Sequence, residues 1–161
     1  MFRTTSRRTL IAAAALAMTG CGFHLRGRFS LPFETLYISY NLNTPLGSQL
    51  SRQLKAGSDV RLVNSPSEAQ AILYVLGERR SRNVVAYNAY GDAREYELKL
   101  EVSFRLAAPD GALYLPDTVI PSVREISYNE EDYLTRDAEE ALVINEMLSD
   151  IVVQMVRRIE K

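Results

Sequence analysis

Hydrophobic and polar residues alternate without a break between Arg94 and Leu106. One face of this segment would carry Tyr96, Leu98, Leu100, Val102, Phe104 and Leu106. The other face would carry Glu95, Glu97, Lys99, Glu101, Ser103 and Arg105. A period of two over this length predicts a long antiparallel strand, with one buried face and one face that meets water or a polar partner.

Shorter segments, alternating at 35–40 and apolar at 71–77, predict other strands. They cover residues 35–40, 60–63, 71–77 and 119–128, with turn residues at 64–68 and at Pro109-Asp110-Gly111. Pro121 lies inside the last of these segments. Because proline cannot donate a hydrogen bond to a neighbouring strand, this residue favours an edge strand or a bulge.

Two segments predict helices. Thr44 and Pro45 are typical of an N-cap and a first helical position, and the leucines at 46, 50 and 54 then recur at fourfold spacing up to Gly57. In the last 25 or so residues, one helical face is apolar: Ala138, Ala141, Leu142, Leu148, Ile151, Val152, Met155 and Ile159. Arg157, Arg158 and Lys161 would then lie at the negative end of the helix dipole. The predicted fold class is α+β, a two-layer sandwich with two helices packed on one face of a four-stranded, mainly antiparallel sheet.

The N-terminal segment has the architecture of an export signal. Three arginines precede an apolar run over residues 10–18, which is too short for a membrane span of about 20 residues. Thr19-Gly20-Cys21 resembles the lipobox of bacterial lipoproteins, in which the cysteine is acylated and becomes the mature N-terminus. We therefore expect a cleaved signal peptide over 1–20, a lipidated tether over 21–34, and one domain over 35–161. The alternative is an ordinary secreted protein with a spare thiol.

Composition narrows the possible functions of the mature chain. Removal of residues 1–20 leaves 141 residues, of which 16 are basic and 20 acidic, and a formal charge of −4. Nucleic acid is therefore not an expected partner. His24 is the only histidine, and an acylated Cys21 leaves no thiolate, so neither a metal site nor a cofactor is expected. The common catalytic motifs are also missing from the sequence, which predicts a protein that is not an enzyme.

Arg79, Arg80 and Arg82 form the one local concentration of charge, in the segment that leaves the strand over 71–77. The planar guanidinium group suits bidentate contact with phosphate, so a site for a phosphorylated lipid is one interpretation. The other is a solvated hairpin end, which is the commoner role of a short charge run. Tyr87 and Tyr90 flank the next turn. One interpretation is that their rings pack against a partner, and the other is that they are ordinary residues of a sheet edge.

The segment Cys21-Gly22-Phe23-His24-Leu25-Arg26-Gly27 resembles the mature N-terminus of the LptE family of lipopolysaccharide-assembly lipoproteins. The alternating strand at Glu95-Tyr96 and the late Asn145-Glu146-Met147 support this resemblance. It implies a sandwich that plugs and helps assemble the LptD β-barrel of the outer membrane, and that delivers lipopolysaccharide to the cell surface. Gly22, rather than Asp, follows the cysteine, which also favours the outer membrane in the sorting pattern of such lipoproteins.

The resemblance also implies lipopolysaccharide binding through two basic residues. Arg136 matches the second of them, just before the C-terminal helix, whereas Ala89-Tyr90 stand where the first would lie. We hypothesise that Arg79, Arg80 or Arg82 supplies the missing charge. Two other function classes stay open: a generic envelope lipoprotein that scaffolds another outer-membrane complex, and a lipid-modifying enzyme, which would need converging acids in a deep pocket.

Overall fold

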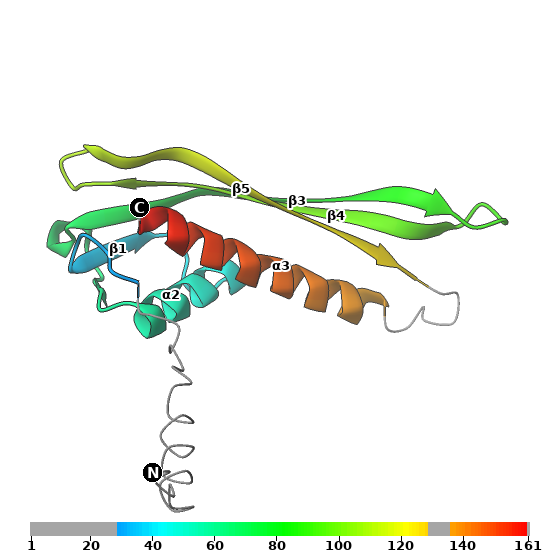
Figure 1. Ribbon diagram of the computed structural model, residues 1–161, viewed down its shortest axis with the longest axis horizontal. Helices are drawn as coiled ribbons and strands as arrows, with labels where there is room; N and C mark the ends of the chain where they lie inside the picture. Colours follow the sequence, from blue (N-terminus) through cyan, green and yellow to red (C-terminus); the bar gives the residue numbers. More distant parts are fainter. Residues whose placement is uncertain (1–28, 129–135, 161) are drawn as a thin grey trace, which may run out of the picture.

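The computed structural model describes residues 29–128 and 136–160, and it shows two helices on one face of a single sheet (Figure 1). The strands are β1 (Thr35–Ser39), β2 (Arg61–Leu62), β3 (Ala71–Tyr87), β4 (Ala93–Ala107) and β5 (Leu113–Ser127). The helices are α2 (Pro45–Gly57) and α3 (Arg136–Ile159), and a short 3-10 turn, η2, covers Pro66–Glu68. The predicted α+β class and its two layers are confirmed.

The sheet has five strands in the order β2-β1-β3-β4-β5. Each of the five predicted strand segments contributes one of them, so the predicted sheet of four is wrong by one strand. It is also mixed, because β1 runs parallel to both β2 and β3. Only two residue pairs join β2 to β1. So short a strand has no alternation from which its pairing could be predicted, and the direction of a neighbouring strand is not written in local periodicity.

Helix α2 begins and ends where the sequence predicts. The Thr44 hydroxyl accepts a hydrogen bond from the Gly47 N–H at 3.1 Å, which caps the first turn, and Pro45 follows as the first helical residue. The three leucines at positions 46, 50 and 54 are fully buried against the sheet. The apolar stripe thus fixes which side of α2 faces the core.

Strands β3, β4 and β5 form a long antiparallel meander. Its turns at 88–92 and 108–112 each have a glycine in the left-handed region, Gly91 with φ +90° and Gly111 with φ +92°. The turns are where the sequence predicts them, but the strands are longer. β3 continues to Tyr87 instead of ending at Gly77, and β5 begins at Leu113. The polar residues of these extensions are held by ladder pairing with β4.

The core lies between the helices and the sheet face that carries the predicted apolar residues of β4. In α3 the buried side chains all lie from Met147 onward: Met147, Leu148, Ile151, Val152, Met155, Val156 and Ile159. Three residues predicted on the packing face, Ala138, Ala141 and Leu142, are exposed, and Leu142 is 64 % exposed. Val143 and Ile144 pack against the core there instead. The side of α3 that faces the core in its N-terminal turns therefore differs from the side that the apolar pattern predicts.

The chain ahead of β1 packs on the domain from Phe29 onward. Phe29 and Leu31 are half-buried against the core and Phe33 is buried, although all three belong to the segment expected as a tether. The expected signal peptide, Cys21 and His24 lie outside the described residues. Within residues 29–128 and 136–160, neither helix is long and apolar enough to cross a membrane.

Candidate functional site

The arginines of the charge concentration lie inside β3, so their predicted place in a segment leaving a strand is wrong. Arg80 is paired with Leu100 of β4 and Arg82 with Leu98, whereas Arg79 is paired with Glu101. Residues directly opposite each other on neighbouring strands share a face. Arg80 and Arg82 therefore lie on the helix side of the sheet, and Arg79 lies on the other side.

Arg82 connects β3 to the first half of α3. Its Nη1 lies 3.1 Å from Glu140 Oε2, and its guanidinium carbon lies 4.0 Å from the centre of the Tyr96 ring. A hydrogen bond to Tyr96 and the charge of Glu140 raise the pKa of Arg82 above its ordinary value, against the opposing effect of burial. This guanidinium therefore carries a fixed positive charge at every physiological pH.

A second arginine meets the same aromatic group. The Arg136 guanidinium, at the first residue of α3, lies 4.6 Å from the centre of the Tyr128 ring. Tyr128 in turn packs edge-on against Tyr96, with ring centres 5.7 Å apart and an interplanar angle of 63°. Two cations thus converge on a tyrosine pair, an arrangement that cation–π attraction stabilises. We call Arg82, Tyr96, Tyr128, Arg136 and Glu140 the arginine–tyrosine cluster.

Tyr128 is the more deeply buried of the two rings in the arginine–tyrosine cluster, with 4 % of its surface exposed against 8 % for Tyr96. Burial raises the pKa of its phenol and Glu140 raises it further, while the two guanidinium groups of the cluster lower it by less. The phenol is therefore neutral at neutral pH. Its hydroxyl has no hydrogen-bond partner among the described residues.

The other two arginines lie apart from the cluster. Arg80 Nε donates a hydrogen bond to Glu78 Oε1 at 2.7 Å, and its side chain stays about half exposed. Arg79 faces the far side of the sheet, beside Glu101 of β4. Glu101 forms an ion pair with Lys99, with Nζ and Oε1 3.0 Å apart. Of the four predicted lipid-binding arginines, the structure brings Arg82 and Arg136 together and leaves Arg79 on the opposite face.

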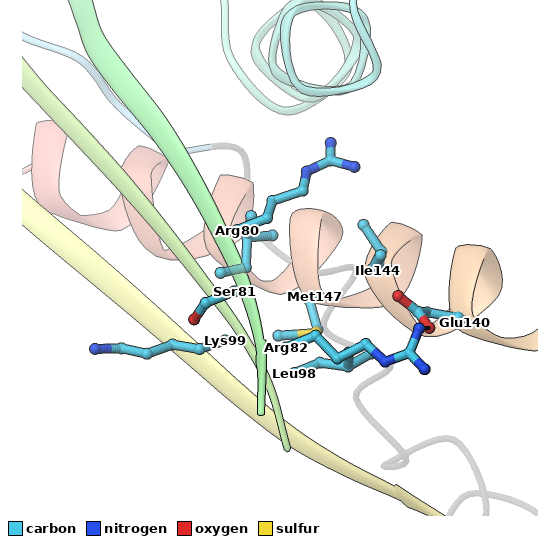
Figure 2. A pocket seen from close by; sticks show the side chains of 9 residues that line it. Arg80, Ser81, Arg82, Leu98, Lys99, Glu140, Ile144 and Met147 are labelled. Carbon is cyan, nitrogen blue, oxygen red and sulfur yellow. Dashed lines mark hydrogen bonds and ion pairs between the residues drawn. The ribbon is translucent and has the colours of Figure 1, made fainter. Parts of the chain in front are cut away.

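A cavity of about 180 Å³ adjoins the arginine–tyrosine cluster, between β3, β4 and the first half of α3 (Figure 2). Its lining residues are Arg80, Ser81, Arg82, Leu98, Lys99, Leu100, Glu140, Ile144 and Met147. In Figure 2 the Arg82 head points toward Glu140, whereas the Lys99 side chain points to the opposite side of the strands. Three of its apolar lining residues, Leu98, Leu100 and Met147, are at most 3 % exposed, and four of the lining residues are charged.

The side of the β3–β5 meander away from the helices forms a second polar surface, which we call the open face. From β4 it carries Glu95, Glu97, Lys99, Glu101, Ser103 and Arg105, as the alternation predicts. From β5 it carries Val119 and Val123, which are 57 % and 46 % exposed. At the tip of the first hairpin, Tyr90 is 87 % exposed. This surface mixes both signs of charge with separate apolar side chains.

Sequence reasoning missed three members of the arginine–tyrosine cluster. Tyr96 was assigned only to the core face of its strand, Tyr128 only to the end of a strand, and Glu140 to no role. One signal was available, since Glu140 follows Arg136 by four residues and so shares its side of the helix. The meeting of Tyr96 with Tyr128 depends on the pairing of β4 with β5, which no local pattern contains. Among the described residues, no group of three or more histidine, cysteine or acidic side chains could hold a metal ion.

Comparison with known proteins identifies the family. Residues 33–159 match the family LptE, described as lipopolysaccharide-assembly. The chain belongs to the LptE family. The LPS-assembly lipoprotein LptE of Pectobacterium atrosepticum is 30 % identical over 156 residues, 94 % of this chain and 83 % of that protein. LptE of Photorhabdus laumondii is 27 % identical over 152 residues, 93 % of this chain and 82 % of that protein.

A solved structure agrees with this LptE assignment. Lipoprotein B from Nitrosomonas europaea, determined in solution, superposes with a TM-score of 0.73 and 28 % sequence identity, over 86 % of this chain and 90 % of that one. The resemblance drawn from the sequence is confirmed. LptE proteins are non-enzymatic lipopolysaccharide-assembly lipoproteins, so the expectation of a protein without enzyme activity is confirmed as well.

Proposed function

We propose that this LptE-family chain is an outer-membrane lipoprotein that occupies the lumen of an LptD-type β-barrel, helps that barrel assemble, and takes part in delivering lipopolysaccharide to the cell surface. The observation that carries the proposal is the family match over residues 33–159. Acylated Cys21 would anchor the chain in the periplasmic leaflet. Several acyl chains hold a protein on a membrane far more firmly than one, because each buried methylene contributes about 0.8 kcal/mol.

The open face supports the barrel partner. The lumen of a large outer-membrane barrel is polar, so a domain inside it must offer polar groups rather than a continuous apolar patch. The open face does so, because it carries charged residues of both signs from β4 beside a few exposed apolar side chains from β5. The exposed Tyr87 and Tyr90 at one hairpin tip add rings that can pack on a partner and donate hydrogen bonds.

Lipopolysaccharide binding is assigned to Arg136 together with the β3 arginines Arg79, Arg80 and Arg82. Lipopolysaccharide carries phosphate groups, and guanidinium groups bind phosphate with paired hydrogen bonds. Arg82 and Arg136 support this assignment best, because both are fixed on the arginine–tyrosine cluster. Replacing all three β3 arginines with serine should weaken lipopolysaccharide binding. Unchanged binding would remove them from the site.

The barrel partner is tested by mild detergent extraction of outer membranes that carry the tagged full-length chain. We expect a large β-barrel protein to co-purify in equal amount. A second outer-membrane lipoprotein, tagged in the same way and present at the same level, serves as the control and should not retain that barrel. A chain that elutes alone would favour the alternative, a generic envelope lipoprotein that scaffolds another complex.

The membrane anchor has a separate test. In the Cys21→Ser variant we expect the protein to leave the outer-membrane fraction and appear in the soluble periplasmic fraction. The wild-type chain should incorporate labelled palmitate, and the variant should not. Retention of the variant in the membrane without label would show that something other than acylation of Cys21 holds the chain there.

A further inference from the structure

The segment ahead of β1 alternates between two kinds of residue. Its odd-numbered positions hold apolar side chains and one glycine: Phe23, Leu25, Gly27, Phe29, Leu31 and Phe33. Its even-numbered positions hold polar side chains and one proline: His24, Arg26, Arg28, Ser30, Pro32 and Glu34. Because side chains point to opposite sides of an extended chain in turn, this pattern predicts one apolar side from residue 23 to residue 33.

The described part of this segment follows the pattern. Phe33 is buried, and Phe29 and Leu31 are half-buried against the core. The even-numbered residues between them are exposed. The alternation is therefore a packing pattern from residue 33 back to residue 29, and it continues without a change of period to residue 23 in the sequence.

Phe29 also lines a groove of about 940 Å³ between the end of α2, the last turns of α3 and β5. The lining of this groove includes Phe29, Gly57, Ser122, Val153, Val156 and Glu160. Val156 is buried and Val153 is half-buried, so the groove offers apolar contacts beside its polar groups. The residues that precede Phe29 in the chain thus join the domain at this groove.

We propose that residues 23–28 lie in this groove in extended form. Phe23 and Leu25 then face the two valines of the groove, while the polar residues between them face solvent. Six extended residues reach about 20 Å, whereas α3 covers only about 10 Å from Val153 to Glu160. The segment is therefore long enough to follow the groove. Its apolar pair is also unlike a free linker, which is typically rich in glycine, serine, proline or charge.

The proposal goes beyond the proposed function and does not depend on a barrel partner. It concerns the connection between the membrane anchor at Cys21 and the domain. A packed segment holds the domain in one orientation relative to the anchor, whereas a free linker of the same length lets the domain turn.

Single cysteines test the alternation directly. The chain over 21–161 with Cys21→Ser has no thiol, and each of four variants adds one: Phe23→Cys, His24→Cys, Leu25→Cys and Arg26→Cys. Cysteine behaves as a small apolar residue and so preserves the pattern at positions 23 and 25. The rate of reaction with a maleimide is divided by the rate of the same variant in denaturing urea. We expect this ratio to be about tenfold lower at positions 23 and 25 than at 24 and 26, because a packed thiol reacts only when the segment opens.

A charge in the groove tests where the segment packs. In the Phe23→Cys chain, Val153→Glu should raise the rate ratio to that of the His24→Cys chain. Leu142→Glu is the matched control, because it adds the same charge to the same helix at a position that is 64 % exposed. The control should leave the slow rate unchanged. Circular dichroism confirms that each variant is folded.

Urea unfolding supplies a second measurement that needs no reagent. Phe23→Ser should lower the urea midpoint by roughly 0.5 M, because it removes a partly buried ring from the folded state. His24→Ser, one position along the chain, should leave the midpoint unchanged.

Three results would overturn the proposal. Equal rate ratios at the four positions, together with equal midpoints, would mean that the segment does not pack. Slow rates that persist in the Val153→Glu chain would place the segment outside the groove. Slow rates that rise on dilution would assign the groove to a second copy of the chain. None of these results bears on co-purification with a barrel, so the proposed function stands or fails separately.

Discussion

The Phe29 ring lies directly against the backbone of Gly57, and the Phe29 N–H donates a hydrogen bond to the Gly57 carbonyl oxygen at 2.9 Å. Gly57 is the last residue of α2, and Phe29 stands ahead of the first strand. A Cβ atom at position 57 would overlap the ring. This contact fastens the segment that leads to Cys21 onto the end of a helix.

The Gly57→Ala variant should therefore be less stable than the wild type. We expect the free energy of unfolding to fall by about 1–2 kcal/mol. Overpacking typically costs about 1–3 kcal/mol, and the better helix propensity of alanine offsets part of this loss. Urea unfolding followed by circular dichroism measures the change.

Two further variants make the Gly57 prediction specific. Gly77→Ala is the matched control, since its added Cβ meets only Ser103 Oγ at a contact distance of 3.4 Å. In a Phe29→Ala background, Gly57→Ala should cost nothing, because the ring it displaces is gone. An equal loss in both backgrounds would contradict the assigned contact.

Tyr128→Phe should stabilise the domain at neutral pH. The phenol oxygen is buried without a hydrogen-bond partner among the described residues, and such a group costs about 1–3 kcal/mol. We expect the free energy of unfolding to rise by about 1 kcal/mol, the lower end of that range. Tyr90→Phe, at a position that is 87 % exposed, should change nothing. A destabilised Tyr128→Phe variant would show that the hydroxyl is satisfied after all.

The same variant should also alter the alkaline limb of the stability profile. Burial raises the pKa of Tyr128 above 10, so the folded state holds the phenolic proton more tightly than the unfolded chain does. Its contribution to stability is complete below pH 10 and is lost as the pH rises through the folded-state pKa. The advantage of Tyr128→Phe over the wild type should therefore grow above pH 10. Urea unfolding between pH 8 and 11 measures it, and a constant difference would contradict the shift.

Thr44→Ala should weaken the start of α2. The Thr44 hydroxyl accepts the Gly47 N–H, and loss of such a cap typically costs about 1 kcal/mol. Thr44→Ser keeps the hydroxyl and should retain most of the wild-type stability. Equal losses in the two variants, measured by urea unfolding, would assign the effect to the methyl group instead of the hydrogen bond.

Pro121→Thr should make the domain more prone to self-association. β5 is the outermost strand on its side of the sheet, and Pro121 has no N–H to offer along the free edge. Threonine restores a donor on an exposed strand, which is a template for pairing with another chain. Sedimentation velocity should show concentration-dependent dimers in Pro121→Thr but not in Ser122→Thr, its neighbour on the same strand. Monomers throughout would show that Pro121 does not protect the edge.

Local sequence patterns predicted the parts of this fold that depend on one segment alone. The cap at Thr44, the leucine stripe of α2 and the alternation of β4 each follow from the periodicity of a single element. The extension of β3 through Arg79 to Tyr87 was missed because its residues are polar and gain their stability from pairing with β4. The parallel direction of β1 was missed because local periodicity does not contain the direction of a neighbouring strand.

The candidate site was predicted in its residue types but not in its geometry. Three nearby arginines indicated a phosphate site, and Arg136 followed from the family resemblance. That Arg79 faces away from Arg80 and Arg82 follows from strand periodicity only when the segment is known to be a strand. The cavity depends on α3 lying across β3 and β4, and its contact from Arg82 to Glu140 joins residues 58 apart in the sequence.

Helix α3 has buried side chains only from Met147 onward. Its amide protons should therefore fall into two groups that exchange with solvent by different routes. Amide protons from Met147 to Ile159 sit over fully packed side chains, so they should exchange only when the whole domain opens. Those from Asp137 to Glu146 lie on a half with exposed and half-buried side chains, so they should exchange by local opening at a much smaller free energy. One continuous helix thus has an end that opens only with the whole domain and an end that opens on its own.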